Sequence, residues 1–342
     1  METLTLEADR AARALAETHG VTATRLTPLG SELASTFRAA TDRGELAVKF
    51  QLSDPIEIEV QRWRADIAAR LHAAGLPVPA VVPARDGSTL GATSVDGTPV
   101  AVLAIDWVDA LPYADAELGP HLVSQLGGEL GRVAARMQAE LAAAPAPPHE
   151  IDHTWAMHDV ARTIAAHLAP PHPRLPAEAR LAGERALRIH ERFIAPHKGF
   201  LPRALVHQDL HDSNVLVGPN GLIRAIIDFD DMVLGWRIAE PAVAAAYLAR
   251  HAADPVLAAT SVLAGWSEEV PVTMAEREAF LPLVAIRLAL NTVVWAARAE
   301  SDRGAYAAMR SRGSAGTFAT LATAAEAEGG AAAAAADELR PA

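Results

Sequence analysis

The stretch Ala204–Asp231 contains the residues whose types and spacing best fit a chemical reaction. A polar loop, residues 207–214, separates two short apolar runs, and Asp228 closes a third apolar run. Asp209 and Asn214 in the loop offer oxygen atoms, the ligands that Mg²⁺ prefers. A carboxylate can also accept the proton of an attacking hydroxyl group. These residue types indicate metal-assisted transfer of a phosphoryl group.

The segment between the second and third apolar runs predicts that these oxygen atoms meet. Residues 218–221 read Gly-Pro-Asn-Gly, and an Asn-Gly pair between two apolar runs is a strong hairpin signal. A hairpin folds the third run back along the second. We therefore expect Asn214 and Asp228 to lie at one end of the hairpin, with Asp209 on the adjoining loop.

The order His-x-Asp-x-x-x-x-Asn, followed by an Asp that closes a strand, is similar to the catalytic loop and metal-binding segment of protein kinases. In that order Asp209 is the general base, and Asn214 and Asp228 hold Mg²⁺. A rival interpretation takes His207 and His211 as ligands of a metal-dependent hydrolase. It leaves Asn214 and Asp228 without a role, so we favour the kinase interpretation.

Two further segments extend the resemblance. Residues 227–232 and 240–244 resemble the hydroxylysine kinase branch of the aminoglycoside phosphotransferase and choline kinase superfamily. The resemblance implies an α+β, two-lobed protein-kinase-like fold, with an N-terminal antiparallel sheet plus helix and a mainly helical C-terminal lobe. It implies ATP or GTP as the phosphoryl donor, and an amino alcohol or hydroxy-amino acid such as hydroxylysine as the acceptor. An aminoglycoside O-phosphotransferase is the alternative enzyme, and an inactive kinase-like binding protein is a further alternative.

The N-terminal part must supply the nucleotide site. Sequence patterns predict strands, and then a helix, over Thr24–Leu29, Thr36–Ala40, Leu46–Phe50 and Pro55–Ala74. The run that ends at Lys49 resembles the kinase strand whose lysine binds the phosphates. By the same resemblance, Glu59 of the helix pairs with Lys49 and holds it extended.

Two more strands are expected, near Ala80–Pro83 and over Val100–Trp107. The second of these resembles the last kinase strand before the interlobe hinge, where the backbone contacts the nucleotide base. The resemblance therefore implies that Asp106, Trp107 and Val108 bind the nucleotide.

Beyond Leu118 the apolar pattern becomes helical. Helices are predicted over residues 121–144, 153–168, 177–196, 235–253 and 273–299. We therefore expect an N-terminal nucleotide-binding lobe, residues 1–108, and a C-terminal catalytic and acceptor-binding lobe, residues 109–321. The Ala/Gly-rich tail, residues 322–342, is predicted to be disordered.

Acidic side chains crowd the predicted mouth of the site. Asp212, Asp230 and Asp231 lie beside the predicted base and metal ligand, so we expect an acceptor with a positive charge. His211 is a further candidate for contact with the acceptor. Arg287 lies on an apolar predicted helix, where it either binds a substrate carboxylate or forms a buried salt bridge.

Composition limits the remaining classes of protein. The chain has 342 residues, a net charge of −12 and no cysteine, which disfavours nucleic acid as a partner and excludes disulfides. The first residues lack the pattern of a secretion signal, and no uncharged apolar run reaches the length of about 18 residues typical of membrane spans. We expect a cytoplasmic monomer or homodimer that acts on a small-molecule hydroxyl acceptor, with no membrane partner.

Overall fold

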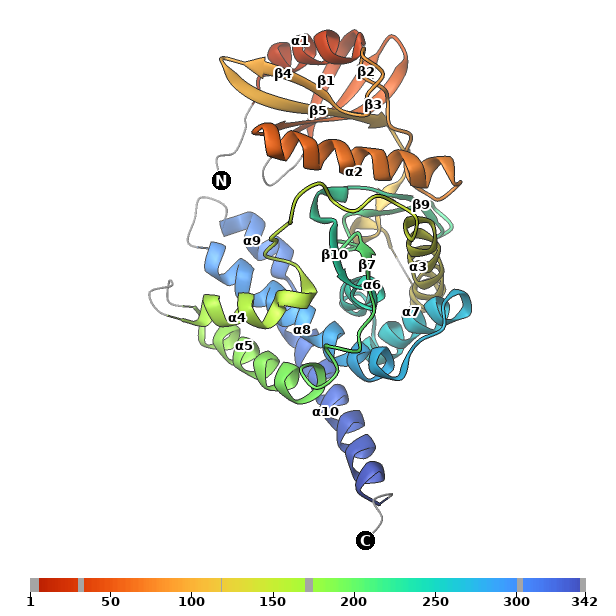
Figure 1. The fold of residues 1–342 in the computed structure, drawn as a ribbon, viewed down its shortest axis with the longest axis vertical. Helices are drawn as coiled ribbons and strands as arrows, with labels where there is room; N and C mark the ends of the chain where they lie inside the picture. The colour runs from red at the N-terminus through yellow and green to blue at the C-terminus, as the bar shows by residue number, and fades with distance from the viewer. Residues whose placement is uncertain (1–5, 30–33, 118, 170–174, 300–303, 339–342) are drawn as a thin grey trace. The chain divides into compact units, whose positions relative to one another are not determined.

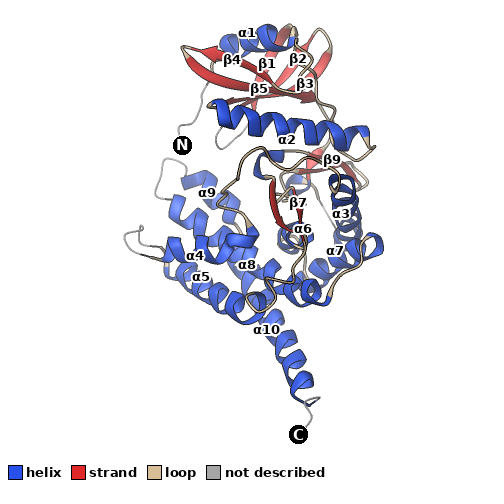
Figure 2. Cartoon of the chain, viewed as in Figure 1, coloured by secondary structure: helices blue, strands red, loops and turns tan. Residues whose placement is uncertain are grey.

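The computed structural model describes residues 6–29, 34–117, 119–169, 175–299 and 304–338. The chain divides into two compact units. Unit 1 comprises residues 1–110, 143–151 and 224–230, and unit 2 comprises residues 111–142, 152–223 and 231–342. Figure 2 shows the five-stranded sheet in unit 1 and the helices that dominate unit 2. The first boundary lies close to the predicted one, but unit 1 also takes two later segments.

An antiparallel sheet forms the centre of unit 1. The strands stand in the order β1-β2-β3-β5-β4. Their bounds are Ala23–Leu29 for β1, Ser35–Thr41 for β2, Gly44–Leu52 for β3, Gly91–Val95 for β4 and Thr98–Asp106 for β5. The sequence patterns missed β4, which is rich in small and polar residues. The strand expected near Ala80–Pro83 is only a single bridge between Val81 and Ile105.

A helix covers each face of this sheet. Because side chains alternate along a strand, neighbouring residues of β5 face different helices. Val102 belongs to the core under α1 (Ala8–His19), and Leu103 packs in the cluster under α2 (Pro55–Ala73). Figure 1 draws the two helices on opposite sides of the sheet. Lys49 of β3 is the register partner of Leu103, so it lies on the face that α2 covers.

Unit 2 is built around α8 (Met274–Arg298), whose residues 279–295 are all buried. By length and composition alone α8 could cross a membrane, but 94% of its apolar window is buried inside the structure, as in the core helix of a globular protein. Helices α4, α5, α6, α9 and α10 contact α8. The bounds of the other helices are Pro120–Leu141 for α3, Val160–Leu168 for α4, Ala177–Ile189 for α5, Ala239–Ala249 for α6, Pro255–Glu269 for α7, Gly304–Ser311 for α9 and Ser314–Glu338 for α10.

Short strands frame the polar loop in unit 2. Antiparallel pairs join β7 (Arg203–Val206) to β10 (Val233–Trp236), and β8 (Val215–Val217) to β6 (Leu111–Pro112). Residues 207–214 therefore connect the end of β7 to the start of β8. The Gly218 N–H donates to Leu222 O at 3.0 Å and closes the predicted turn before β9 (Ile223–Ile226).

The C-terminal segment differs from the prediction. We expected disorder beyond residue 321, whereas α10 continues as a helix to Glu338. Alanine has the highest intrinsic helix propensity, and Leu321 and Ala325 are buried in a helix that contacts α5 and α8. The Ala/Gly-rich, low-complexity composition of the tail hid this apolar contact. Residues 339–342 lie outside the described residues.

Candidate active site

The polar loop in unit 2 is fixed on both sides of Asp209. His207 is buried, and its Nδ1 accepts the backbone N–H of Asp209 at 3.2 Å. Gln208 has a φ of +70°, in the left-handed region that residues other than glycine rarely adopt. Backbone strain of this kind persists only where the surrounding structure fixes it, and it concentrates at functional sites.

Glu240 of α6 supplies part of that fixation. Its Oε2 accepts the N–H of Gln208 at 3.2 Å, and the side chain is 1% exposed. Burial raises the pKa of Glu240 to about 8, although backbone hydrogen bonds from Gln208 and His207 lower it in part. Glu240 is therefore protonated at neutral pH and holds the loop as an uncharged group.

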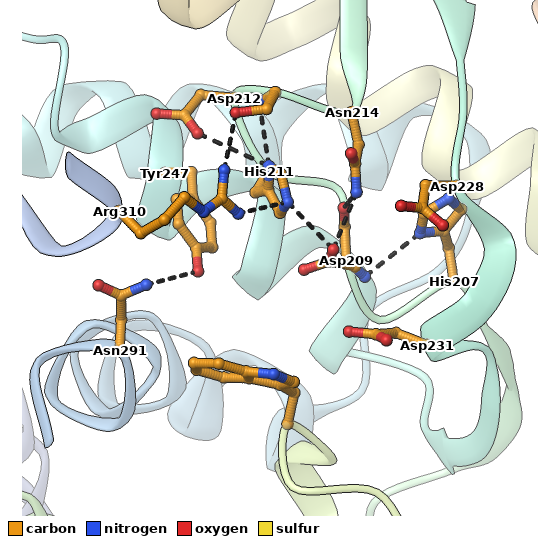
Figure 3. Close-up of polar contacts among 12 residues, drawn as sticks. His207, Asp209, His211, Asp212, Asn214, Asp228, Asp231, Tyr247, Asn291 and Arg310 are labelled. Atoms are coloured by element: carbon orange, nitrogen blue, oxygen red, sulfur yellow. Dashed lines mark hydrogen bonds and ion pairs between the residues drawn. The ribbon is translucent and has the colours of Figure 1, made fainter. Parts of the chain in front are cut away.

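Asp209 is the centre of the polar network in Figure 3. Its Oδ2 accepts the Asn214 Nδ2–H at 2.8 Å and lies 3.1 Å from His211 Nε2, while its Oδ1 pairs with Arg287 Nη2 at 3.1 Å. Burial raises the pKa of Asp209, but the charge and hydrogen bond of His211 and the charges of Arg287 and Arg310 outweigh burial and hold it below its usual range. Asp209 is therefore an ionised carboxylate, the form that can accept a proton.

Arg287 is buried beneath this loop. Its Nη1 donates to Trp155 O at 3.1 Å, and its guanidinium lies over the Trp155 and Tyr247 rings, 4.9 and 5.5 Å from their centroids. Its side chain is 1% exposed. Of the two roles left open by the sequence, the structure places Arg287 in the buried salt bridge, with Asp209 as its partner.

Asp212 forms a second buried carboxylate centre. It pairs with His251 Nε2 at 2.9 Å, and lies 3.6 Å from His211 Nδ1 and 3.8 Å from Arg250 Nη1. Burial raises the pKa of Asp212, but hydrogen bonds from His211 and His251 and the charge of Arg250 hold it well below its usual range. Asp212 is therefore already paired with basic side chains of the protein, Arg250 and His251.

The other two acidic residues of the predicted cation pocket are paired as well. Asp231 lies 3.0 Å from His153 Nε2 in unit 2, and Asp230 accepts a hydrogen bond from Lys49 in unit 1. The acidic density that the sequence shows is therefore compensated by basic groups that are distant along the chain. This finding removes the observation that motivated a cationic pocket of Asp212, Asp230 and Asp231.

Arg310 of α9 is a polar residue of this network that sequence reasoning missed. Its Nη1 donates to Ser213 Oγ at 2.8 Å, and its Nη2 lies 2.6 Å from His211 Nε2. Figure 3 shows the Arg310 guanidinium pointing toward His211. Arg310 follows His211 by 99 residues, so no local spacing could connect the two.

In unit 1 a single lysine lies between two carboxylates. Lys49 Nζ donates to Asp228 Oδ1 at 2.9 Å and to Asp230 Oδ2 at 2.7 Å. Burial lowers the pKa of Lys49, but the charges of the two carboxylates outweigh burial and raise it above its usual range. The Ile226 N–H donates to Pro77 O at 2.7 Å and attaches this segment to unit 1. Asp228 has a φ of +65°, a second strained backbone at a predicted functional residue.

These side chains fit the groups that a kinase-like fold implies. Two carboxylates share one ammonium group in unit 1, which leaves oxygen atoms of the type that Mg²⁺ binds and a cation of the type that binds phosphate. In unit 2 the Asn214 Nδ2–H groups donate to Asp209 O and Oδ2, so the amide oxygen is the atom suited to a metal. Asn214 and Asp228 belong to different units, and their predicted meeting stays a prediction.

The predicted pair of Lys49 with Glu59 does not form. Glu59 is exposed on α2, where its Oε2 lies 2.8 Å from His149 Nε2, and Asp228 and Asp230 take its place beside Lys49. Glu59 lies one turn before the buried Trp63, but the first turns of α2 are largely exposed, and there the carboxylate is beside His149.

The three hinge residues predicted to meet the nucleotide line a pocket of about 550 Å³ in unit 1. Two of the three backbone N–H groups already donate hydrogen bonds within unit 1. The Asp106 N–H donates to Ala80 O at 2.9 Å, and the Trp107 N–H donates to Glu45 O at 3.0 Å. Contact of Asp106, Trp107 or Val108 with a nucleotide base stays a prediction.

The hydrolase alternative finds no support in the geometry. Among the residues that the structure describes, no group of three or more His, Asp or Glu side chains could hold a metal ion together. His207 Nδ1 is occupied by a backbone N–H, and His211 Nδ1 accepts the Ser213 N–H at 2.9 Å. These imidazoles therefore hold the loop in place.

Comparison with known proteins identifies a family and several relatives. The family model of the phosphotransferase enzyme family matches residues 25–280. The hydroxylysine kinase of Bos taurus is 27% identical over 256 residues, which cover 70% of this chain and 65% of that protein. The match thus spans slightly less than two thirds of the length of this relative.

Solved structures of small-molecule kinases share the fold. An amicoumacin kinase has a TM-score of 0.65 at 14% identity, covering 91% of this chain and 93% of that one. A microcompartment-associated aminopropanol kinase has a TM-score of 0.62 at 20% identity, covering 93% and 98%. The predicted α+β, kinase-like fold, with an antiparallel N-terminal sheet and a helical C-terminal part, is therefore confirmed. Because the family model covers well over half of its residues, the chain belongs to the phosphotransferase enzyme family.

Proposed function

We propose that this protein is a small-molecule kinase that transfers the γ-phosphoryl group of ATP or GTP to a hydroxyl group of a hydroxy-amino acid or amino alcohol, such as hydroxylysine. The observation that carries the proposal is the Asp209 network. Asp209 is an ionised carboxylate in the polar loop, directly after the strained Gln208, oriented by Asn214 and compensated by Arg287. That arrangement suits a base that takes a proton from an acceptor hydroxyl group.

The remaining roles follow the kinase order of the sequence. Lys49 binds the phosphates of the nucleotide, and Asn214 and Asp228 hold Mg²⁺, which when bound neutralises phosphate charge. Asp209 accepts the hydroxyl proton of the acceptor. The ion pairs of Lys49 with Asp228 and Asp230 support this assignment, because they hold the ammonium group beside the proposed metal ligand.

An antibiotic kinase is the second candidate. The fold similarity to an amicoumacin kinase favours it, whereas the sequence similarity to a hydroxylysine kinase favours the amino-acid acceptor. The paired state of Asp212, Asp230 and Asp231 weighs against a polycationic acceptor, because such an acceptor needs carboxylates without a partner in the protein.

A donor and acceptor screen tests the proposal. Release of nucleoside diphosphate is measured with ATP and GTP over hydroxylysine, homoserine, ethanolamine, choline and aminoglycosides, with and without Mg²⁺. We expect Mg²⁺-dependent release with hydroxylysine or a related acceptor. Release with aminoglycosides alone would favour the second candidate, and no release with any acceptor would contradict the proposal. We further propose a cytoplasmic monomer or homodimer that binds neither nucleic acid nor membranes.

A further inference from the structure

Cationic side chains outnumber carboxylates around the proposed base. The contacts within unit 2 join two carboxylates to three guanidinium groups and two imidazoles: Asp209, Asp212, Arg250, Arg287, Arg310, His211 and His251. Most of these side chains are buried. At most 16% of the side chain is exposed in Asp209, Asp212, His211, Arg250 and Arg287. Buried charge without a counter-ion is costly, and these contacts alone leave positive charge in excess.

The contact between Arg310 and His211 shows where that excess lies. Arg310 Nη2 and Asp209 Oδ2 both approach His211 Nε2, at 2.6 and 3.1 Å, while His211 Nδ1 accepts the Ser213 N–H. A guanidinium group has only donors. If the ring proton is on Nε2, Arg310 faces another donor. If the ring proton is on Nδ1, the Ser213 N–H faces another donor, and Asp209 Oδ2 faces the lone pair of Nε2. Every protonation state leaves at least one contact unsatisfied.

The tautomer with its proton on Nε2 leaves the fewest conflicts, and the single conflict then lies at Arg310. Among the described residues, Arg310 Nε is also buried without a hydrogen-bond partner. Arg310 is therefore held in place by Ser213. The charges of Asp209 and Asp212 also act on it, but among the described residues no carboxylate forms an ion pair with its guanidinium group.

We propose that Arg310, together with His211, binds the carboxylate of a hydroxy-amino-acid acceptor and so places its hydroxyl group beside Asp209. The inference rests on the proposed function and narrows its acceptor class to hydroxy acids. His211 Nε2 lies 3.1 Å from Asp209, so an anion bound there is adjacent to the base that acts on the acceptor. An arginine donates two parallel hydrogen bonds to a carboxylate, which fixes its orientation.

The test uses acceptor pairs that differ only in the carboxylate. These are L-homoserine with 3-aminopropan-1-ol, and 5-hydroxylysine with 1,5-diaminopentan-2-ol. A charge-assisted contact is worth roughly 10- to 150-fold in affinity. We expect the wild-type protein to prefer the acid by about that factor in kcat/KM. Arg310→Ala should remove the preference by raising KM for the acid, with KM for the amine and for the nucleotide unchanged.

Two further variants separate charge from folding. Arg310→Lys keeps a positive charge and should recover part of the preference for the acid. Arg312→Ala removes an exposed arginine two residues away and should leave both acceptors unchanged. Equal use of acid and amine by the wild-type protein would overturn the inference. So would a rise in nucleotide KM in Arg310→Ala, since the anion would then be a phosphate of the donor.

Failure of the proposed function is distinguishable from failure of this inference. If no acceptor is phosphorylated, the kinase proposal fails, and calorimetric titration of the same acids and amines decides the inference. Binding of the acid that exceeds binding of the amine, and that is lost in Arg310→Ala, supports a carboxylate site. Absence of binding, or equal binding of acid and amine, overturns it.

Discussion

The charged clusters of the two units have opposite compositions. In unit 1, the two carboxylates of Asp228 and Asp230 share the single cation of Lys49. In unit 2, Asp209 and Asp212 lie among three arginines and two histidines, so positive charge is in excess. We propose that a cation completes the first cluster and an anion completes the second. This difference matches a division of labour in which unit 1 binds a metal and phosphates, and unit 2 binds an acidic acceptor.

Net charge did not reveal this division. The chain carries a net charge of −12, which by itself favours cationic partners. The buried side chains near Asp209 have the opposite sign. The charges around Asp209 therefore favour a different acceptor from the one that the charge of the whole chain favours.

The largest effect is expected at the proposed base. Asp209→Asn should lower kcat by about 10²- to 10⁴-fold, because the amide cannot accept the hydroxyl proton. Nucleotide affinity should stay nearly unchanged, since Asp209 acts on the acceptor. Steady-state kinetics and nucleotide calorimetry provide the measurement, with the exposed Asp152→Asn as control. Wild-type turnover in Asp209→Asn would reject the assignment.

The second effect concerns stability in the cation-rich cluster. Arg287→Met should lower the free energy of unfolding by about 3–5 kcal/mol, because it leaves the Asp209 charge without its buried partner. Urea unfolding measures the loss. Arg277→Met, on the exposed face of the same helix, should change stability by less than about 0.5 kcal/mol. Equal stability of the two variants would mean that Arg287 does not compensate Asp209.

A pair of variants separates the two carboxylates of unit 1. Asp228→Asn and Asp230→Asn each remove one partner of Lys49, but only Asp228 is proposed as a metal ligand. Calorimetry should show that Mg²⁺ strengthens nucleotide binding by at least about tenfold in Asp230→Asn, as in the wild-type protein, and far less in Asp228→Asn. The same Mg²⁺ dependence in both variants would remove the metal role of Asp228.

Local sequence patterns predicted the strands and the contacts between residues that are close in sequence. The alternation of apolar residues located β1, β2, β3 and β5, and the spacing within residues 207–214 placed Asp209 and Asn214 on one loop. The capping-box spacing of Thr273 and Glu276 also marks the observed start of α8. In each case the interacting residues are neighbours in sequence, so residue type and spacing were sufficient.

Long-range partners were beyond such patterns. Arg310 meets His211 across 99 residues, and Lys49 meets Asp228 across 179 residues. The resemblance to kinases implied roles for Lys49 and Asp228 but chose Glu59 as the partner of the lysine, whereas Asp228 and Asp230 are its partners in the structure. Asp212 was predicted to face a cationic acceptor because its partners, Arg250 and His251, follow about 40 residues later, beyond any local periodicity.

The last effect concerns the pH dependence of stability at Glu240. Its pKa is raised by burial from 4.5 to about 8, so the unfolded chain loses this proton at lower pH than the folded protein does. The contribution of Glu240 to stability is therefore fully present below about pH 4.5 and is lost as the pH rises toward 8. In Glu240→Gln, which can still accept the Gln208 N–H, this loss is absent. Urea unfolding at pH 5, 6.5 and 8.5 should show the variant gaining stability relative to wild type as the pH rises, and a constant difference would contradict the assignment.

The central claim is that Lys49 serves the nucleotide and the Asp209 network serves an acidic acceptor. The most direct test is calorimetric titration of Lys49→Met and Arg310→Ala with Mg²⁺-ATP and, separately, with 5-hydroxylysine. We expect Lys49→Met to weaken nucleotide binding by at least about tenfold and to leave hydroxylysine binding unchanged, and Arg310→Ala to do the reverse. Unchanged nucleotide affinity in Lys49→Met, or a variant that weakens both ligands equally, would contradict the account.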